Sequence, residues 1–191
     1  MPCTNTCFGA GAIGENAKNV KIKNMREISA GIIIYRITAQ GPKFLLLYHG
    51  NNYWNFPKGK LEVAERSFQA ALREIKEETG LVRGDLNFSY YFKTKENFYF
   101  YRKIGEKKMK VFKNITFYLA ETQKKQIKIS EKKEGEPHEG FAWVTFPEAM
   151  KVLTKNKDSR RILTQAYNFL RKSKSSHAPS DRIDTGKPKM V

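Results

Sequence analysis

Residues 66–79 constrain the fold of this 191-residue chain most strongly, because their apolar side chains repeat with the period of an α-helix. The apolar positions follow the spacing i, i+3, i+4, i+7 and therefore lie along one stripe of the helix. They are Phe68, Ala71, Leu72 and Ile75. Gly80 follows directly, at the position where glycine often ends a helix. We therefore predict a helix over residues 66–79 that packs one face against a core.

Segments rich in β-branched and aromatic residues lie on both sides of this helix, which favours strands. The expected strands cover residues 27–37, 43–49, 87–95, 98–104, 110–121 and 140–146. Residues 147–154 and 159–172 are expected to be helices, and residues 50–59 a loop because they contain Gly, Asn and Pro. The order of strands, helix, strands and helices predicts an α+β fold, a mixed sheet packed between helices.

The chain length suits one domain with additional terminal segments. We expect a flexible extension over residues 1–25, the domain over 26–172 and a disordered basic tail over 173–191. Cys3 and Cys7 fall in the extension and are expected to be incidental. No apolar run approaches the roughly 18 residues that a membrane helix needs, and the N-terminus lacks the pattern of a secretion signal. We therefore expect a cytoplasmic protein with no membrane association.

The whole chain carries a net charge of +17, and the positive charge is concentrated in its second half. Residues 93–133 hold thirteen Lys or Arg against four Glu, a net charge of +9. Such asymmetry favours anionic partners, namely phosphates, nucleotides or RNA. Solubility combined with a lysine-biased genome is an equally good explanation. We expect a monomer with no obligate protein partner.

Three carboxylates project from one face of the expected helix. Glu74, Glu77 and Glu78 occupy positions i, i+3 and i+4, and like charges at this spacing destabilise a helix. A Mg²⁺ ion would remove that repulsion, because carboxylate oxygens bind it together with substrate phosphates. On spacing alone the alternative is a solvated acidic face, in which Arg73 pairs with Glu77 four residues later.

The neighbours of these carboxylates favour the metal site. The segment carries seven residues at fixed spacing: Gly59, Glu65, Arg73, Glu74, Glu77, Glu78 and Gly80. With apolar Ile75 and Leu81 between and after them, the pattern resembles the signature of the Nudix hydrolase family at every fixed position. The resemblance implies an α/β/α sandwich in which the motif forms a loop, a helix and a loop. It also implies hydrolysis of a nucleoside diphosphate linked to a further group, X, with Mg²⁺ or Mn²⁺.

The resemblance implies a role for each matched residue. The residues that would bind the metal or take the proton from the attacking water are Glu74, Glu77, Glu78 and the carbonyl of Gly59. Arg73 completes the expected catalytic set. Glu65 and Arg73 would brace the loop and the helix, and Gly80 would allow the turn out of the helix. Family members often carry one more Glu before the Trp of a late strand; Pro137 aligns there, and Glu136 is favoured over Glu139 as the substitute ligand.

The residues before the motif, YWNFPKG, resemble the branch that includes the asymmetric diadenosine tetraphosphate hydrolases. That likeness extends over residues 27–170 and implies cleavage of diadenosine tetraphosphate (Ap4A) to ATP and AMP. Lys58 would contact a phosphate as a point charge, with a solvated loop lysine as the alternative. Candidates for stacking on a base are His49, Tyr53, Tyr118 and Phe141, followed by Tyr48 and Tyr91. Core packing is the alternative for each of them.

Three other functions fit the same pattern. Removal of pyrophosphate or a cap from RNA 5′ ends would suit the basic strands and tail. A highly phosphorylated inositol is another anionic substrate of the right charge. A Nudix-fold sensor that binds a nucleotide without cleaving it would be expected to lack some of the motif carboxylates, and all of them are present here.

Overall fold

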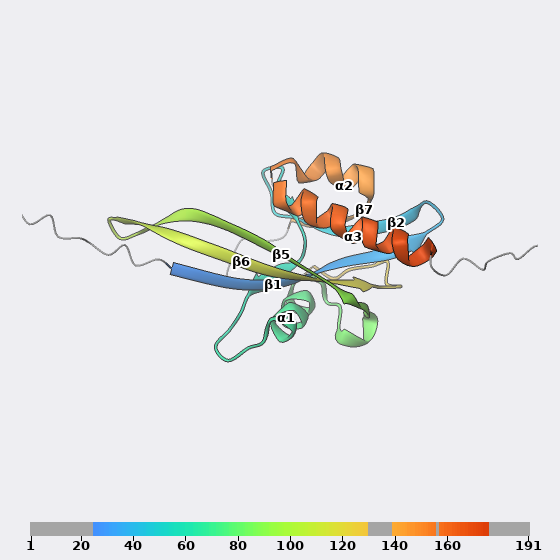
Figure 1. Ribbon diagram of the computed structural model, residues 1–191, viewed down its shortest axis with the longest axis horizontal. Coiled ribbons are helices and arrows are strands. Elements are labelled where there is room, and N and C mark those ends of the chain that lie inside the picture. The colour runs from blue at the N-terminus through green and yellow to red at the C-terminus, as the bar shows by residue number, and fades with distance from the viewer. Residues whose placement is uncertain (1–24, 130–138, 156, 176–191) are drawn as a thin grey trace, which may run out of the picture.

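The computed structural model describes residues 25–129, 139–155 and 157–175. The strands are β1 (Met25–Thr38), β2 (Gly41–Tyr48), β3 (Trp54–Asn55), β4 (Lys58–Lys60), β5 (Asn87–Ile104), β6 (Lys107–Glu121) and β7 (Gly140–Thr145). The helices are α1 (Ser67–Thr79), α2 (Phe146–Val152) and α3 (Lys157–Ser175), with 3₁₀ turns at Arg83–Asp85 and Leu153–Lys155. The strands form one mixed sheet, with α1 on one face and α2 and α3 on the other (Figure 1). The α+β sandwich expected from the sequence is confirmed.

β1 lies at the centre of the sheet and is buried on both faces. The strand order is β3-β2-β1-β6-β5, and β1 pairs in parallel with β6 while its pairing with β2 is antiparallel. Alternate side chains enter opposite cores: Ile32 and Ile34 pack with α1, whereas Ile33 and Tyr35 pack with α2 and α3. A strand covered by helices on both sides needs an uninterrupted apolar run, which residues 30–35 supply.

The segment between β2 and α1 fills a wedge where β1 and β2 separate. β1 pairs with β2 only over residues 35–38, and its earlier part pairs with β4 instead. Between these two contacts, Ile32 N donates to Pro57 O at 3.3 Å. A Cβ on Gly31 would lie 2.4 Å from Pro57 O and 2.7 Å from the Lys58 Cβ. Glycine at position 31 therefore allows the segment to approach β1 and places Lys58 and Gly59 against the sheet.

The structure differs from the expected elements in two places. Residues 87–95 and 98–104 form one continuous strand, β5, because the intervening Glu96 and Asn97 stay paired with β6 across from Ile115 and Asn114. The expected loop over residues 50–59 contains the short strands β3 and β4, whose pairing partners are distant in sequence. None of the helices within the described ranges is long and apolar enough to cross a membrane. The domain limits at residues 26 and 172 stay predictions, and both terminal segments lie almost entirely outside the described residues.

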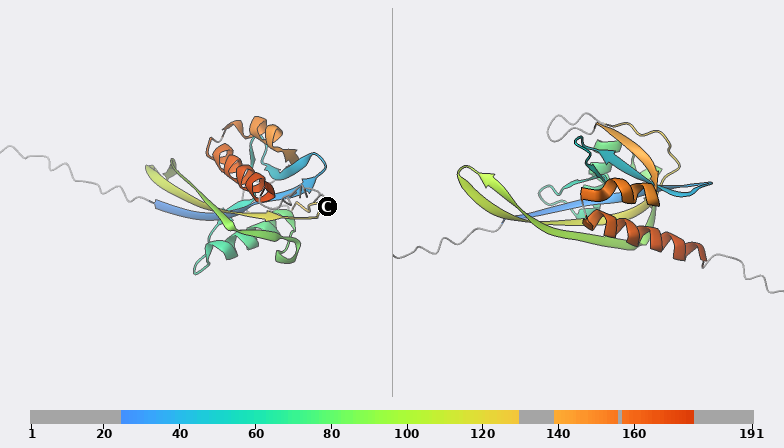
Figure 2. Two further views of the ribbon diagram at one scale, coloured as in Figure 1. Left: turned by 45° about the vertical axis from the view of Figure 1, so that its right-hand side comes forward. Right: turned by 90° about the horizontal axis from the view of Figure 1, so that it is seen from above.

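The outer parts of β5 and β6 extend past both helix layers. Together with the beginning of β1 they form a projecting ribbon of three strands, seen at the left of Figure 1 and in both views of Figure 2. No side chain from residue 97 to residue 110 is buried, so this ribbon adds little to either core. Its turn is two residues long, with Gly105 at φ 59° between the paired residues Ile104 and Lys107.

Candidate active site

The motif loop and α1 meet at Gly59 and Glu74. A Cβ built on Gly59 would lie 1.8 Å from both Cδ and Oε1 of Glu74, so only glycine fits against this carboxylate. One turn further along, Glu78 Oε2 accepts a hydrogen bond from Lys58 N at 2.9 Å. Glu74 and Glu78 are 5% and 3% exposed. Two carboxylates of α1 are thus held against the backbone of β4 at Lys58 and Gly59.

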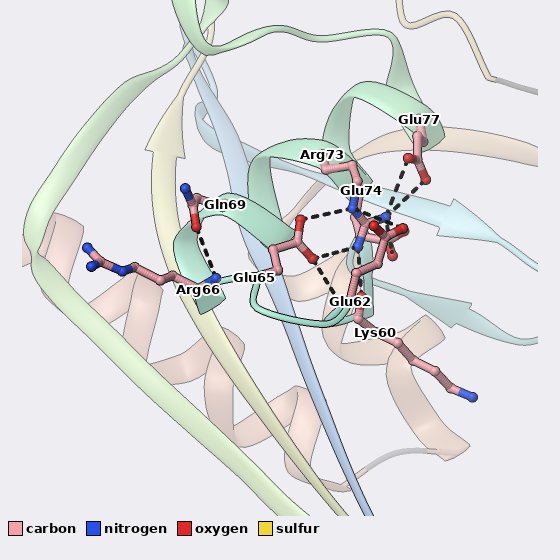
Figure 3. A network of polar contacts seen from close by, with 8 residues as sticks. All are labelled: Lys60, Glu62, Glu65, Arg66, Gln69, Arg73, Glu74 and Glu77. Carbon is pink, nitrogen blue, oxygen red and sulfur yellow. Dashed lines mark hydrogen bonds and ion pairs between the residues drawn. The ribbon is translucent and has the colours of Figure 1, made fainter.

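Arg73 ties the loop to the helix through several contacts at once (Figure 3). Its Nε and Nη2 donate to the two oxygens of Glu65, each at 3.0 Å, and Nη2 also donates to Lys60 O at 2.8 Å. Nη1 lies 3.0 Å from Glu74 Oε1 and 3.3 Å from Glu77 Oε2. The hydrogen bonds to Glu65 raise the pKa of Arg73, and the same contact lowers the pKa of Glu65. Both groups therefore stay charged at neutral pH.

The ends of α1 are defined by local contacts. Arg66 precedes the helix, and its backbone N donates to Gln69 Oε1 at 3.0 Å. Gly80 follows with φ 71°, a left-handed conformation that favours glycine, and its N donates to Lys76 O at 3.0 Å. Lys128 N then donates to Thr79 O at 3.1 Å. The helix end that carries Glu77 and Glu78 is therefore tied to the segment after β6.

The carboxylates of α1 suit a divalent metal, although Arg73 is bonded to two of them. Across the described ranges, no three carboxylate, His or Cys side chains are grouped closely enough to hold a metal ion as they stand. The cause is visible in the contacts, because the Arg73 guanidinium lies between Glu74 and Glu77. The carboxylate oxygens of Glu74, Glu77 and Glu78 are nevertheless hard ligands of the kind that Mg²⁺ and Mn²⁺ prefer. A cation at this site would compete with Arg73 for the carboxylates of Glu74 and Glu77.

Comparison with protein families agrees with the geometry of this loop and helix. A family model described as the NUDIX domain matches residues 25–166. The chain belongs to the Nudix family. It is a Nudix pyrophosphohydrolase, as expected from the motif.

Among known Nudix proteins, this chain is similar to asymmetrical bis(5′-nucleosyl)-tetraphosphatases. The one from Sus scrofa is 29% identical over 150 residues, which are 74% of this chain and 94% of that protein. The one from Caenorhabditis elegans is 28% identical over 127 residues, 65% of this chain and 83% of that protein.

Solved structures of Nudix proteins share the fold. The C. elegans Ap4A hydrolase binary complex superposes with a TM-score of 0.61 and 23% identity, covering 76% of this chain and 98% of that one. The Escherichia coli dihydroneopterin triphosphate pyrophosphohydrolase gives a TM-score of 0.56 at 21% identity, covering 75% and 99%. At these identities the superpositions establish the Nudix fold alone.

The structure separates the expected substrate-binding residues into two groups. His49 and Tyr53 lie together before the Nudix motif, with ring centroids 5.3 Å apart, and Tyr53 Oη accepts from Asn55 Nδ2 at 2.8 Å. Tyr118 and Phe141 are partly buried and pack against the core beneath α1; the Tyr118 ring lies 5.1 Å from Phe68. Core packing therefore accounts for the latter pair, whereas His49 and Tyr53 border the loop that carries Lys58.

The other substrate candidates are placed as follows. Tyr48 packs against Trp54, with ring centroids 4.8 Å apart, and Tyr91 is 98% exposed at the irregularity in β5. Glu136 lies outside the described residues, so its expected role as a metal ligand stays a prediction. Glu139 is described: its N donates to Tyr48 O at 2.8 Å, and its carboxylate lies against Gly50. This position leaves Glu139 beside the His49–Tyr53 loop.

Sequence reasoning missed a charged cluster next to the Nudix loop. The side chain of Glu27 is 8% exposed, and its Oε1 lies 2.6 Å from Arg102 Nη1 and 3.3 Å from Lys60 Nζ. Burial raises the pKa of Glu27, but the Arg102 hydrogen bond and the Lys60 charge outweigh it, so the net pKa is lowered. Burial lowers the pKa of nearby Lys113, and the positive charge of Lys58 lowers it further. No sequence spacing could reveal this cluster, because four different strands supply its members.

Proposed function

We propose that this Nudix enzyme hydrolyses bis(5′-nucleosyl) tetraphosphates, cleaving Ap4A to ATP and AMP with Mg²⁺ or Mn²⁺. The single observation that carries the proposal is the placement of buried Glu74 and Glu78 against the Lys58–Gly59 backbone. The similarity to tetraphosphatases over most of the chain supports this substrate. Nudix enzymes of this kind act on anionic phosphoanhydrides, which agrees with a net charge of +17.

In this proposal, each residue of the motif has a task. Glu77, Glu78 and the Gly59 carbonyl would bind the metal, and Glu136 would be the additional ligand. When bound, a divalent cation neutralises phosphate charge and lowers the pKa of a water molecule. Glu74 shares the metal or accepts the proton of the attacking water. Arg73 holds the loop carbonyls and the carboxylates in one arrangement through Glu65 and Lys60 O.

Residues outside the motif bind the substrate. Lys58 supplies a point charge for a phosphate of the chain, because its backbone lies beside the carboxylates of α1. His49 and Tyr53 offer aromatic faces at the loop that leads into Lys58, where a nucleobase can stack. We retain Tyr118 and Phe141 only as second-rank candidates, since both pack against the core under α1.

The proposal is tested by a substrate panel at physiological salt with a Mg²⁺ titration. Ap4A should be turned over to equimolar ATP and AMP, and turnover should require the metal. Glu78→Gln should reduce turnover by roughly 10²–10⁴-fold, since the metal site loses a buried carboxylate. Full turnover by Glu78→Gln, or turnover without a divalent cation, would contradict the assignment. Glu74→Gln distinguishes the two roles of Glu74. If the variant needs a higher Mg²⁺ concentration, Glu74 is a metal ligand. If kcat is lower at saturating Mg²⁺ and the pH profile is altered, Glu74 is the base.

A second candidate substrate is the 5′ phosphoanhydride of RNA. The observation that favours it is the exposed aromatic and basic ribbon at one end of the sheet. Triphosphorylated RNA therefore belongs in the same panel. Cleavage of RNA with no cleavage of Ap4A would replace the proposed substrate. Tight nucleotide binding with no turnover of any substrate would instead indicate a sensor.

A further inference from the structure

The projecting ribbon of β1, β5 and β6 exposes three aromatic rings on a single face. Tyr99, Tyr101 and Phe112 are 56%, 55% and 39% exposed. Tyr99 and Tyr101 lie two residues apart on β5, and Tyr99 pairs directly with Phe112 on β6. The ring centroids are 6.1 Å apart for the first pair and 6.2 Å for the second. We call these three rings the aromatic face.

Cations lie directly beside the aromatic face. Lys110 Nζ is 4.0 Å from the centroid of the Tyr99 ring and 5.0 Å from that of Phe112, and Lys108 Nζ is 4.9 Å from that of Tyr101. Exposed Arg26 pairs with Phe112 from the other side, on β1. Successive side chains of a strand point to opposite faces of the sheet. The described ribbon positions on the same side as the aromatic face include no Asp or Glu. The face therefore combines flat rings with uncompensated positive charge.

A groove of about 710 Å³ lies along the aromatic face. Its lining includes Arg26, Ile28, Tyr99 and Phe112, together with the oppositely charged Glu27 and Lys113. Ile28, one of the lining residues, accepts at its backbone O a hydrogen bond from Leu61 N, which follows β4 in the Nudix motif. The strands β4, β1, β6 and β5 lie side by side here, so at about 4.8 Å per strand roughly 15 Å separate β4 from β5.

We propose that the aromatic face binds single-stranded RNA. Bases would stack on Tyr99, Tyr101 and Phe112, and Lys108 and Lys110 would contact the phosphates. Unpaired bases are required because a duplex buries the base faces in its own stack. A second copy of this chain is a poorer occupant, since each copy carries a net charge of +17.

RNA is favoured over DNA because the aromatic face lies on strands that pair, through β1, with β4 of the Nudix motif. The choice rests on the proposed phosphoanhydride hydrolysis, since an RNA 5′ end carries the bond that the Nudix loop would cleave. Binding to the aromatic face requires no metal and no cleavage, so it can be measured separately from turnover.

Fluorescence anisotropy with a 12-nucleotide single-stranded RNA labelled at its 3′ end tests the proposal, using the full chain without divalent metal. Tyr99→Ala combined with Tyr101→Ala should weaken binding by tenfold or more, because each stacked base contributes about 1–3 kcal/mol. Tyr90→Ala is the matched control: this ring is 74% exposed but lies off the ribbon, and its removal should leave the affinity unchanged. Ap4A turnover should be the same in all three proteins.

A second pair of substitutions tests the charges without removing a ring. Lys108→Gln combined with Lys110→Gln should reduce the slope of log K against log salt by about 1.4, since each single-strand phosphate contact contributes about 0.7. The same double variant should leave the thermal midpoint nearly unchanged, because both side chains lie at the surface.

Several results would overturn the proposal. Unchanged RNA affinity in both double variants would place any binding elsewhere on the chain. Equal affinity for duplex RNA would contradict stacking of unpaired bases on this face, and tighter binding of single-stranded DNA of the same sequence would contradict RNA as the occupant. Self-association that the tyrosine substitutions abolish would identify a second copy as the occupant. If Ap4A and RNA both resist cleavage while RNA binding still depends on Tyr99 and Tyr101, the proposed function fails and this inference stands.

Discussion

At Gly59, the absence of a side-chain carbon allows the carboxylate of Glu74, which we propose to be catalytic, to lie against the loop. The backbone of Gly59 is so close to Glu74 that the Cβ of any other residue would overlap the Glu74 carboxylate. The φ angle is ordinary here, so the requirement comes from close approach and not from backbone strain. Glycine at this position of the motif therefore sets how closely the backbone of β4 approaches α1.

Gly59→Ala should lower Ap4A turnover by about 100-fold or more while the protein stays folded. The added methyl group would displace Glu74 from the loop, and small misplacements of catalytic groups have effects of this size. Steady-state kinetics with circular dichroism measure the two properties. Gly84→Ala is the control, because its Cβ would meet no atom within 4 Å, and it should behave as the unmodified protein. Normal turnover by Gly59→Ala would contradict the site geometry.

Arg73→Lys should reduce kcat and the thermal midpoint together, even though the charge is retained. Lysine cannot donate two parallel hydrogen bonds to Glu65 and a third to Lys60 O. We expect a loss of roughly 1–3 kcal/mol in the free energy of unfolding, the range for hydrogen bonds to charged groups. Arg66→Lys is a matched control because Arg66 is exposed and its hydrogen bond to Gln69 uses the backbone. Equal losses in both variants would contradict a bracing role for Arg73.

At the scale of elements, the amphipathic pattern of α1 and the apolar run of β1 were sufficient to predict both segments. The structure begins α1 at Ser67 and ends it at Thr79, one residue from the prediction. The division of β5 into two strands was wrong, because the polar pair Glu96–Asn97 suggested a break where pairing with β6 continues. Strand pairing depends on distant partners, so residues 54–55 and 58–60 could not be recognised as strands from local composition.

Glu27→Gln should destabilise the sheet at neutral pH and have little effect in acid. The folded-state pKa of Glu27 is lowered, so its contribution is complete above the usual carboxyl pKa of 4.5 and is lost as the pH falls through the folded value. We expect a loss of about 1–2 kcal/mol at pH 7, reduced from a fully buried pair because Lys60 and Arg102 are exposed. Urea denaturation of both proteins at pH 7 and at pH 3 measures this difference in the free energy of unfolding. Glu106→Gln, at the exposed turn, should show no such pH dependence.

At the scale of the whole molecule, the domain separates a compact catalytic body from a projecting ribbon. The two cores use residues of β1, β2 and the inner parts of β5 and β6, together with the three helices. The ribbon from residue 97 to residue 110 contributes no buried side chain to them. Apart from the ion pair between Arg102 and Glu27, the ribbon has no evident role in stability, which is why we assign it to binding.

A shortened ribbon should separate the two parts of the molecule. Removing residues 101–104 and 107–110 joins Phe100 and Val111, which already pair with each other, through the existing Gly105-Glu106 turn. The deletion takes four residues from each strand, so the alternation of side chains between the two faces is preserved. Ap4A turnover should be retained, whereas affinity for single-stranded RNA should fall at least tenfold. If the shortened protein loses both its turnover and its folded structure, the ribbon belongs to the core.

The sequence by itself determined the family and the chemistry of the motif, because those depend on residue types at short, regular spacing along one loop and one helix. An α-helix has 3.6 residues per turn, and this repeat alone places Glu74, Glu77 and Glu78 on one face. Only the tertiary structure decided that Arg73 lies between two of these carboxylates, that Glu27 gathers cations from β4, β5 and β6, and that aromatic rings of β5 and β6 form one face. Each of these depends on strands that pair across long separations, and strand register is set by the packing of the whole sheet.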